Sequence, residues 1–171
     1  AVVLAGFMLG IALGAHWGGG LAERGRDPLR RYALLELGLG AYALGAPWLL
    51  ASLTRLPGAL FTIAAAGTAV RYGAALAAIT GPCLLMGASL PLLLRSLTPP
   101  GVSLGEQVGL AYGANTLGAA GGAVAGAFWA VPTFGVWGCS ALGALGSALA
   151  AALALGAARL RWGVVHGRLR G

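Results

Sequence analysis

Long apolar stretches with very few ionisable residues constrain the fold of this chain more than any other feature. Only 9% of its 171 residues are charged and 58% are hydrophobic, whereas an average soluble domain is about 25% charged. A fold so short of charge has too few polar side chains to cover its own surface in water. The sequence therefore predicts a chain that folds in lipid, with the lipid bilayer as its first partner.

Five apolar segments are long enough to cross a bilayer as helices. Each is close to the ~20 residues that a hydrocarbon layer of ~30 Å requires. None alternates with the period of a strand, and a helix satisfies its own backbone hydrogen bonds inside lipid. The predicted fold class is all-α, a polytopic transmembrane helix bundle of about five spans. The predicted spans cover about residues 1–21, 29–53, 72–94, 108–131 and 134–158.

The distribution of arginine predicts the orientation of this bundle. All eleven basic residues are arginines, and five spans place nine of them on one side. Excess positive charge marks the cytoplasmic side, so we expect the Arg-rich loops and a basic tail at 159–171 to be cytoplasmic. Residues 57–70 are apolar but short, and a sixth span there would move the tail's arginines outside. We therefore interpret 57–70 as a re-entrant or interfacial segment.

The net charge of +7 does not indicate nucleic-acid binding. The arginines lie between and after the apolar segments and do not form the continuous basic surface that phosphate contacts require. Cys83 and Cys139 lie inside apolar runs, and no metal-ligand spacing of Cys and His occurs. We expect no nucleic-acid partner, no metal, no cofactor and no catalytic residue in this chain.

Glycines spaced four apart predict two faces for close helix packing. Positions four apart share one helix face, where small residues let another backbone approach. The two sets lie three segments apart, which is typical of the repeated units of transporters, although glycine is abundant enough for the spacing to arise by chance. A homo-oligomer also stays open. The sets are Gly6, Gly10, Gly14 and Gly18 in the first segment, and Gly118, Gly122 and Gly126 in the fourth.

Glu36 is the strongest single candidate for a functional side chain. It lies about two turns inside the second segment, where an ionisable group is costly and usually faces a partner or a watery cavity. One interpretation is a contact for a cation or a proton. The alternatives are an ion pair with Arg30 or Arg31, or a carboxylate that reaches the interface. Tyr32, one turn earlier, joins Glu36 as a candidate polar contact.

Asn115 in the fourth segment is the other candidate polar contact. An amide in lipid needs a partner, and an interhelical hydrogen bond competes with a substrate contact as its role. We expect Thr116 to bond back to its own helix. In the third segment, Pro82 and Pro91 should bend the helix. A bend beside Ser89 either opens a cavity or serves packing alone.

The connection after the first segment carries a resemblance to major facilitator transporters. Its sequence, Gly18-Gly-Gly-Leu-Ala-Glu23-Arg24-Gly-Arg26, resembles their cytoplasmic signature Gly-x-Leu-Ala-Asp-Arg-x-Gly-Arg. Glu23 replaces the aspartate, and one residue is missing before Arg26. Such a motif joins a tight glycine exit from one helix to acid–base contacts under the next, so a major-facilitator-like bundle is expected.

Several motifs in order resemble a narrower family, the membrane half of bacterial fused transporter-like/spermidine synthase-like proteins. The resemblance implies a bacterial cytoplasmic membrane, a fused or associated aminopropyltransferase-like domain, and handling of a polyamine or another small cation. The catalytic residues of that domain do not occur here. The motifs are Gly6-Phe-Met-Leu-Gly-Ile-Ala-Leu-Gly, Tyr32-Ala-Leu-Leu-Glu36-Leu-Gly-Leu-Gly, Leu85-Met-Gly-Ala-Ser-Leu-Pro91-Leu-Leu and Tyr112-Gly-Ala-Asn115-Thr116-Leu-Gly-Ala.

Three functional hypotheses remain open from the sequence. The chain is the membrane module that anchors such a domain, part of a transporter in its own right, or a structural anchor that transports nothing. It begins inside an apolar run and without methionine. We therefore expect a fragment truncated at both ends, with at least one helix missing.

Overall fold

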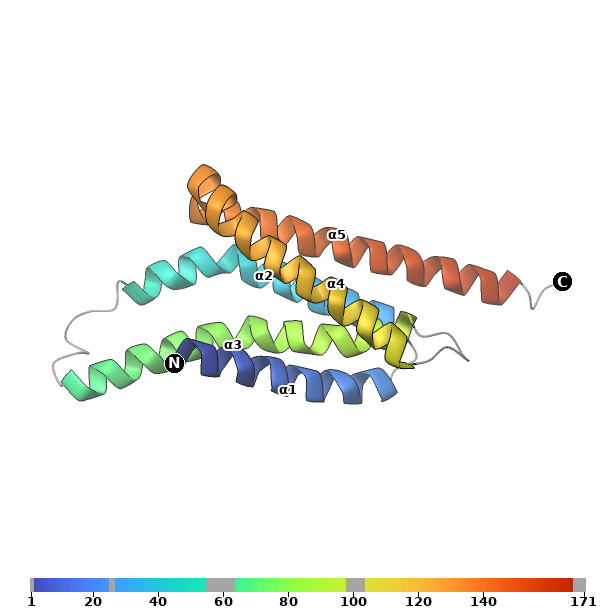
Figure 1. Ribbon diagram of the computed structural model, residues 1–171, viewed down its shortest axis with the longest axis horizontal. Coiled ribbons are helices and arrows are strands. Elements are labelled where there is room, and N and C mark those ends of the chain that lie inside the picture. Colours follow the sequence, from blue (N-terminus) through green and yellow to red (C-terminus); the bar gives the residue numbers. More distant parts are fainter. Residues whose placement is uncertain (1, 25–26, 55–63, 98–103, 168–171) are drawn as a thin grey trace.

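The computed structural model describes residues 2–24, 27–54, 64–97 and 104–167, and this part of the chain is all-α (Figure 1). This confirms that the fold class is all-α, whereas the number of spans and the likeness to major facilitator transporters stay predictions. The elements are α1 (Val2–Arg24), α2 (Pro28–Thr54), α3 (Ala64–Leu97), α4 (Leu104–Ala125), the π-helical segment η2 (Gly126–Ala130) and α5 (Val131–Gly167).

Within the described residues, four helical stretches are long and apolar enough to cross a membrane. They are Val3–Arg24, Pro28–Ser52, Tyr72–Leu97 and Gly105–Leu160. The last contains 56 residues, and as one straight helix it would be about 84 Å long, far more than a bilayer core. It is not straight, because Gly135 takes a non-helical conformation (φ 66°, ψ −175°). Figure 1 shows α4 and α5 as two separate arms that meet at this turn.

The outward surface of the helices is strongly apolar. Phe128 is 82% exposed and Leu117 is 75% exposed on the α4 side, and Leu160 is 74% exposed on α5. Contiguous exposed apolar surface of this kind marks a site of contact with a membrane or another protein. Together with helix length, it supports contact of these helices with a lipid bilayer.

The start of α2 shows how local sequence sets an element boundary. Asp27 precedes the helix, and its Oδ1 accepts a hydrogen bond from the backbone N–H of Arg30 at 3.3 Å. Pro28 occupies the first helical position, where a missing N–H costs nothing. The Arg30 guanidinium also pairs with the Asp27 carboxylate at 2.9 Å. An aspartate cap and a proline therefore fix the point where the chain enters α2.

The first set of predicted glycines lies directly against α3. A Cβ added at Gly6 would come within 2.5 Å of Leu76 Cδ1, and one at Gly10 within 2.6 Å of Cys83 Cβ. A Cβ at Gly14 would overlap the Leu84 carbonyl, and one at Gly18 would lie 2.5 Å from the Ala88 carbonyl oxygen. The backbones of α1 and α3 therefore approach so closely that only glycine fits along this line.

A second contact joins α2 to α5 through small side chains. Near the start of α2, Tyr32 and Leu155 pack against a buried cluster. At the other end of the pair, the rings of Trp48 and Trp137 meet edge to face with centroids 4.5 Å apart. The members of the buried cluster are Leu29, Ala33, Ala151, Ala154 and Ala158.

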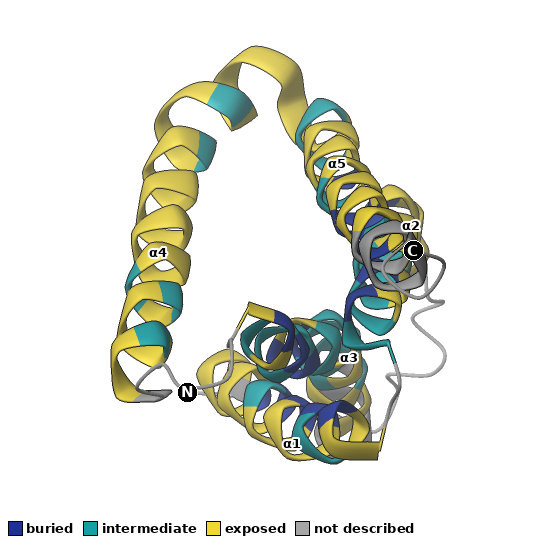
Figure 2. Cartoon of the chain, turned by 90° about the vertical axis from the view of Figure 1, so that its right-hand side faces the viewer, coloured by how far each residue is buried: buried dark blue, intermediate teal, exposed yellow. Residues whose placement is uncertain are grey.

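Helix α4 is the least packed element. Figure 2 shows it exposed along most of its length and standing apart from α5. Within the described residues, a Cβ added at Gly118, Gly122 or Gly126 would meet no atom within 4 Å. Close packing by this second glycine set therefore stays a prediction.

The helix ends divide between two ends of the molecule. The end of α1, the start of α2, the end of α3, the start of α4 and the end of α5 lie toward one end in Figure 1. The end of α2, the start of α3 and the turn between α4 and α5 lie toward the other. Consecutive helices therefore run in opposite directions, as consecutive membrane spans joined by short loops would.

Two predicted segments fall partly outside the described residues. Of the segment 57–70, residues 64–70 form the first turns of α3, and 57–63 are not described. Of the tail 159–171, residues 159–167 continue α5, and 168–171 are not described. Apolar, alanine-rich sequence before Tyr72 explains why α3 begins earlier than the predicted span. The placement of both segments relative to a membrane stays a prediction.

Candidate functional site

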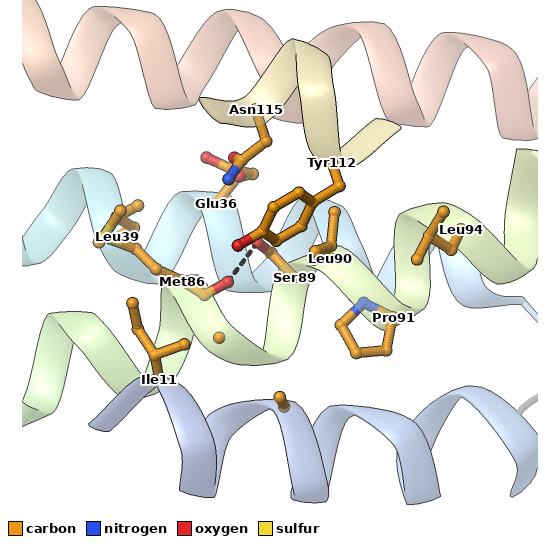
Figure 3. A pocket seen from close by; sticks show the side chains of 12 residues that line it. Ile11, Glu36, Leu39, Met86, Ser89, Leu90, Pro91, Leu94, Tyr112 and Asn115 are labelled. Carbon is orange, nitrogen blue, oxygen red and sulfur yellow. Dashed lines mark hydrogen bonds between the residues drawn. The ribbon is translucent and has the colours of Figure 1, made fainter. Parts of the chain in front are cut away.

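A cavity of about 480 Å³ lies where α1, α2, α3 and α4 meet. Its walls are largely apolar, and its polar side chains are few, which is the usual composition of a pocket for a small molecule. Figure 3 shows these residues converging from the four helices. The lining consists of Ile11, Ala15, Glu36, Leu39, Met86, Gly87, Ser89, Leu90, Pro91, Leu94, Tyr112 and Asn115.

Glu36 supplies the carboxylate of this cavity. It is partly buried on α2, and Tyr32 lies one turn earlier on the same helix. Arg30 is paired with Asp27, and Arg31 donates to the Leu21 carbonyl at 2.6 Å. The predicted alternative, an ion pair between Glu36 and one of these arginines, therefore does not occur in the structure. The Glu36 carboxylate is left without a cationic partner among the described residues.

Helix α4 brings Asn115 and Tyr112 to the opposite wall. In Figure 3 the Asn115 side chain extends from α4 toward the side where Glu36 lies. No side chain in the described ranges forms a hydrogen bond with the Asn115 amide. Thr116 donates to the Tyr112 carbonyl at 2.8 Å, which confirms that its hydroxyl bonds back to its own helix. Of these two neighbouring polar residues, only Asn115 faces the cavity.

The part of α3 around Pro91 forms the remaining polar wall. Pro91 lies inside this helix and lines the cavity together with Ser89. The Ser89 hydroxyl donates to the Met86 carbonyl at 2.8 Å, drawn as the dashed line in Figure 3. Ser89 and Pro91 therefore border a cavity, and the bend that the two prolines predict stays a prediction.

The loop motif after the first span does not take part in the cavity. Glu23 and Arg24 lie exposed at the end of α1, and Arg26 is outside the described residues. No ion pair of Glu23 or Arg24 occurs in the ranges described. The acid–base contact that the motif suggests under the next helix is instead made by Asp27 and Arg30.

Several cavity residues were not predicted. Ile11 and Ala15 of α1 and Leu39 of α2 contribute apolar surface, and nothing in their local sequence separates them from other apolar positions. Gly87 is different, because its position relative to a proline in the sequence could have indicated it. It lies four residues before Pro91, where a proline removes the helical hydrogen-bond donor.

The cavity thus places a few hydrogen-bond acceptors among mostly apolar side chains. Its polar groups are one carboxylate, one amide and two hydroxyls, and an isolated carboxylate in apolar surroundings is stabilised by a cation. The composition of this cavity is therefore suited to a positively charged ligand.

The chain matches no known protein-family model, no curated protein and no solved structure. In the part of the chain that the structure describes, fold and site together define an all-α arrangement with four helical stretches able to span a membrane and a partly polar cavity between helices.

Proposed function

We propose that this chain is a polytopic membrane module whose cavity binds a small organic cation through Glu36. The observation that carries the proposal is the position of Glu36 opposite Asn115 in one cavity, with no cationic side chain of the described residues beside it. An ionisable residue within a membrane span is costly and marks a pathway or a ligand site. A cavity of about 480 Å³ has room for an organic molecule.

The proposal extends to the topology of the module. Gly105–Leu160 crosses the membrane twice, with its reversal at Gly135, so that the chain makes five crossings. The end of the molecule that carries Arg24, Arg95 and Arg159 faces the cytoplasm. The bacterial cytoplasmic membrane is the compartment that the family resemblance implies.

Binding is tested with the protein in lipid nanodiscs, titrated with 2-phenylethylammonium in a calorimeter. Replacing the carboxylate by Glu36→Gln removes a charge-assisted hydrogen bond, so affinity should fall roughly tenfold or more. The matched control is Glu106→Gln, which removes an exposed carboxylate in the first turn of α4. Its affinity should equal that of the unchanged protein. Equal binding by the Glu36→Gln protein, or no binding by the unchanged one, would contradict the proposal.

Anchoring of an aminopropyltransferase-like domain rests on the motif resemblance alone. The end of α5 lies at the same end of the molecule as Arg24 and Arg95, which is the side where such a domain would be held. Sequencing the native gene beyond Gly171 tests this role. A stop codon directly after that position would remove the fused form of the hypothesis and leave the cavity proposal unaffected.

A further inference from the structure

Two prolines inside α3 each leave one backbone carbonyl without its usual donor. A proline has no N–H, so the carbonyl four residues earlier loses its helical hydrogen bond. Pro82 affects Ala78, and Pro91 affects Gly87. Unsatisfied backbone groups are costly in lipid, and the structure should therefore provide a replacement donor at each position.

The first of these carbonyls is satisfied by the protein. The Tyr42 hydroxyl of α2 donates a hydrogen bond to the Ala78 carbonyl. This contact is short and joins α2 to α3 at the point where Pro82 interrupts the hydrogen-bond pattern. It shows that the fold supplies a side-chain donor where one proline has removed the backbone donor.

The second carbonyl has no such donor. Within the described ranges, no side chain donates to the Gly87 carbonyl, and the nearby Ser89 hydroxyl is already committed to Met86. Gly87 and Pro91 both line the cavity. Because glycine has no side chain, the atoms of Gly87 that line the cavity belong to its backbone. Helical carbonyls point toward the C-terminal end, here toward Pro91.

The cavity therefore presents two kinds of acceptor and a single negative charge. The Glu36 carboxylate supplies the charge, and Asn115 and the backbone of Gly87, whose carbonyl we assign to the cavity wall, supply neutral acceptors. The other three acidic residues, Glu23, Asp27 and Glu106, do not line it. Most of the remaining wall is aliphatic. A second positive charge on a ligand would have no counter-ion in the described part of this cavity.

We infer that the ligand is a protonated primary or secondary amine with one charge and an apolar body, whose N–H groups bond both the Glu36 carboxylate and the free Gly87 carbonyl. This inference rests on the proposed cation-binding function and specifies its ligand class. A quaternary ammonium satisfies the charge but offers no N–H to Gly87. A polyamine offers N–H groups but carries charges that the apolar wall leaves unpaired.

The test compares three probes on the unchanged protein in nanodiscs. They are 2-phenylethylammonium, its N,N,N-trimethyl analogue and spermidine. The primary amine should bind roughly tenfold more tightly than the other two, because it alone pairs one charge and also donates to a neutral acceptor. Equal or tighter binding of the trimethyl analogue or of spermidine would overturn the inference.

Replacing a proline then tests whether the ligand N–H binds the Gly87 carbonyl. Pro91→Ala restores a backbone N–H that occupies the Gly87 carbonyl, so the preference for the primary amine over the trimethyl analogue should disappear. The matched control is Pro82→Ala in the same helix, where Tyr42 already serves the Ala78 carbonyl. This variant should keep the preference. A preference unchanged by Pro91→Ala would exclude Gly87 as the contact.

The outcomes separate this inference from the proposed function. If both ammonium probes bind equally and Glu36→Gln weakens both, the cation site stands and the choice of a primary or secondary amine is wrong. If no probe binds the unchanged protein, the proposed function fails as well. Helical content and monodispersity of each variant are measured in the same nanodiscs.

Discussion

Gly14 is the position where α1 approaches α3 most closely. A Cβ there would overlap the carbonyl of Leu84, which is a backbone atom and cannot move aside as a flexible side chain would. The neighbouring Gly10 and Gly18 are almost as restricted. Close backbone approach of this kind gains van der Waals contact, which drives helix association in lipid where the hydrophobic effect is absent.

Gly14→Ala should therefore lower the free energy of unfolding by about 1–3 kcal/mol through overpacking. The control is Gly19→Ala in the same helix, where an added Cβ meets nothing in the described residues within 4 Å. That change should be neutral or slightly stabilising, since alanine favours helix by up to about 1 kcal/mol. Both values are measured by reversible unfolding in mixed micelles. Equal stability of the two variants would mean that α1 and α3 do not touch as described.

The polar residues of the cavity show what sequence can and cannot predict. Glu36 and Asn115 stand out because a charge and an amide are costly in an apolar segment, and both face the cavity. Their common location could not be predicted, because it depends on how α2 and α4 are turned relative to each other. Ile11 and Leu39 carried no signal at all, since an apolar residue suits lipid, core and cavity equally.

Helix positions were more predictable than helix boundaries. Length and hydropathy alone identify α1 and α2 to within a few residues. The start of α3 at Ala64 was not predicted, because Arg71 was read as the end of a separate segment, although one arginine does not interrupt a helix. The π-helical segment was not predicted either, since one extra residue per turn leaves no pattern in sequence.

The reversal between α4 and α5 depends on a single glycine. Gly135 has a positive φ of 66° with ψ near −175°, a region that residues with a Cβ rarely adopt. It is the one residue with positive φ among those described. The ring contact between Trp129 and Phe134, with centroids 5.4 Å apart, spans the start of the turn.

Gly135→Ala should cost about 1–3 kcal/mol of stability, because alanine is strained in this conformation. Gly146→Ala on the same helix is the control, since its added Cβ has open space within the described part and its φ is not positive. Spin labels at the exposed positions Leu117 and Leu145 report the distance between the two arms. A Gly135→Ala protein with unchanged stability and an unchanged distance distribution would show that the turn does not need glycine.

Across the described helices, charge is distributed asymmetrically. Arg24, Arg30, Arg31, Arg95 and Arg159 all belong to helix ends at one end of the bundle. At the opposite end, the turn between α4 and α5 is uncharged and rich in aromatic rings. Positive charge is retained on the cytoplasmic side during membrane insertion, and this asymmetry is the basis for the proposed orientation.

Cysteine labelling tests this orientation in intact cells. In a background with Cys83→Ala and Cys139→Ala, single cysteines replace Arg24, Arg95, Arg159 or Thr133. A membrane-impermeant maleimide should label only the Thr133→Cys protein from outside, because the proposed orientation places the other three positions in the cytoplasm. After the membrane is permeabilised, all four should react. Labelling of any of the three arginine positions from outside would contradict the proposed orientation.

The sparse packing of α4 has a consequence for the cavity that it borders. Asn115 and Tyr112 stand on a helix that makes few contacts with α3 and turns most of its surface outward. For the proposed cation-binding function, we expect acyl-chain order and lateral pressure to influence the spacing between this wall and Glu36. The affinity for the proposed cation should then change with the lipid composition of the bilayer.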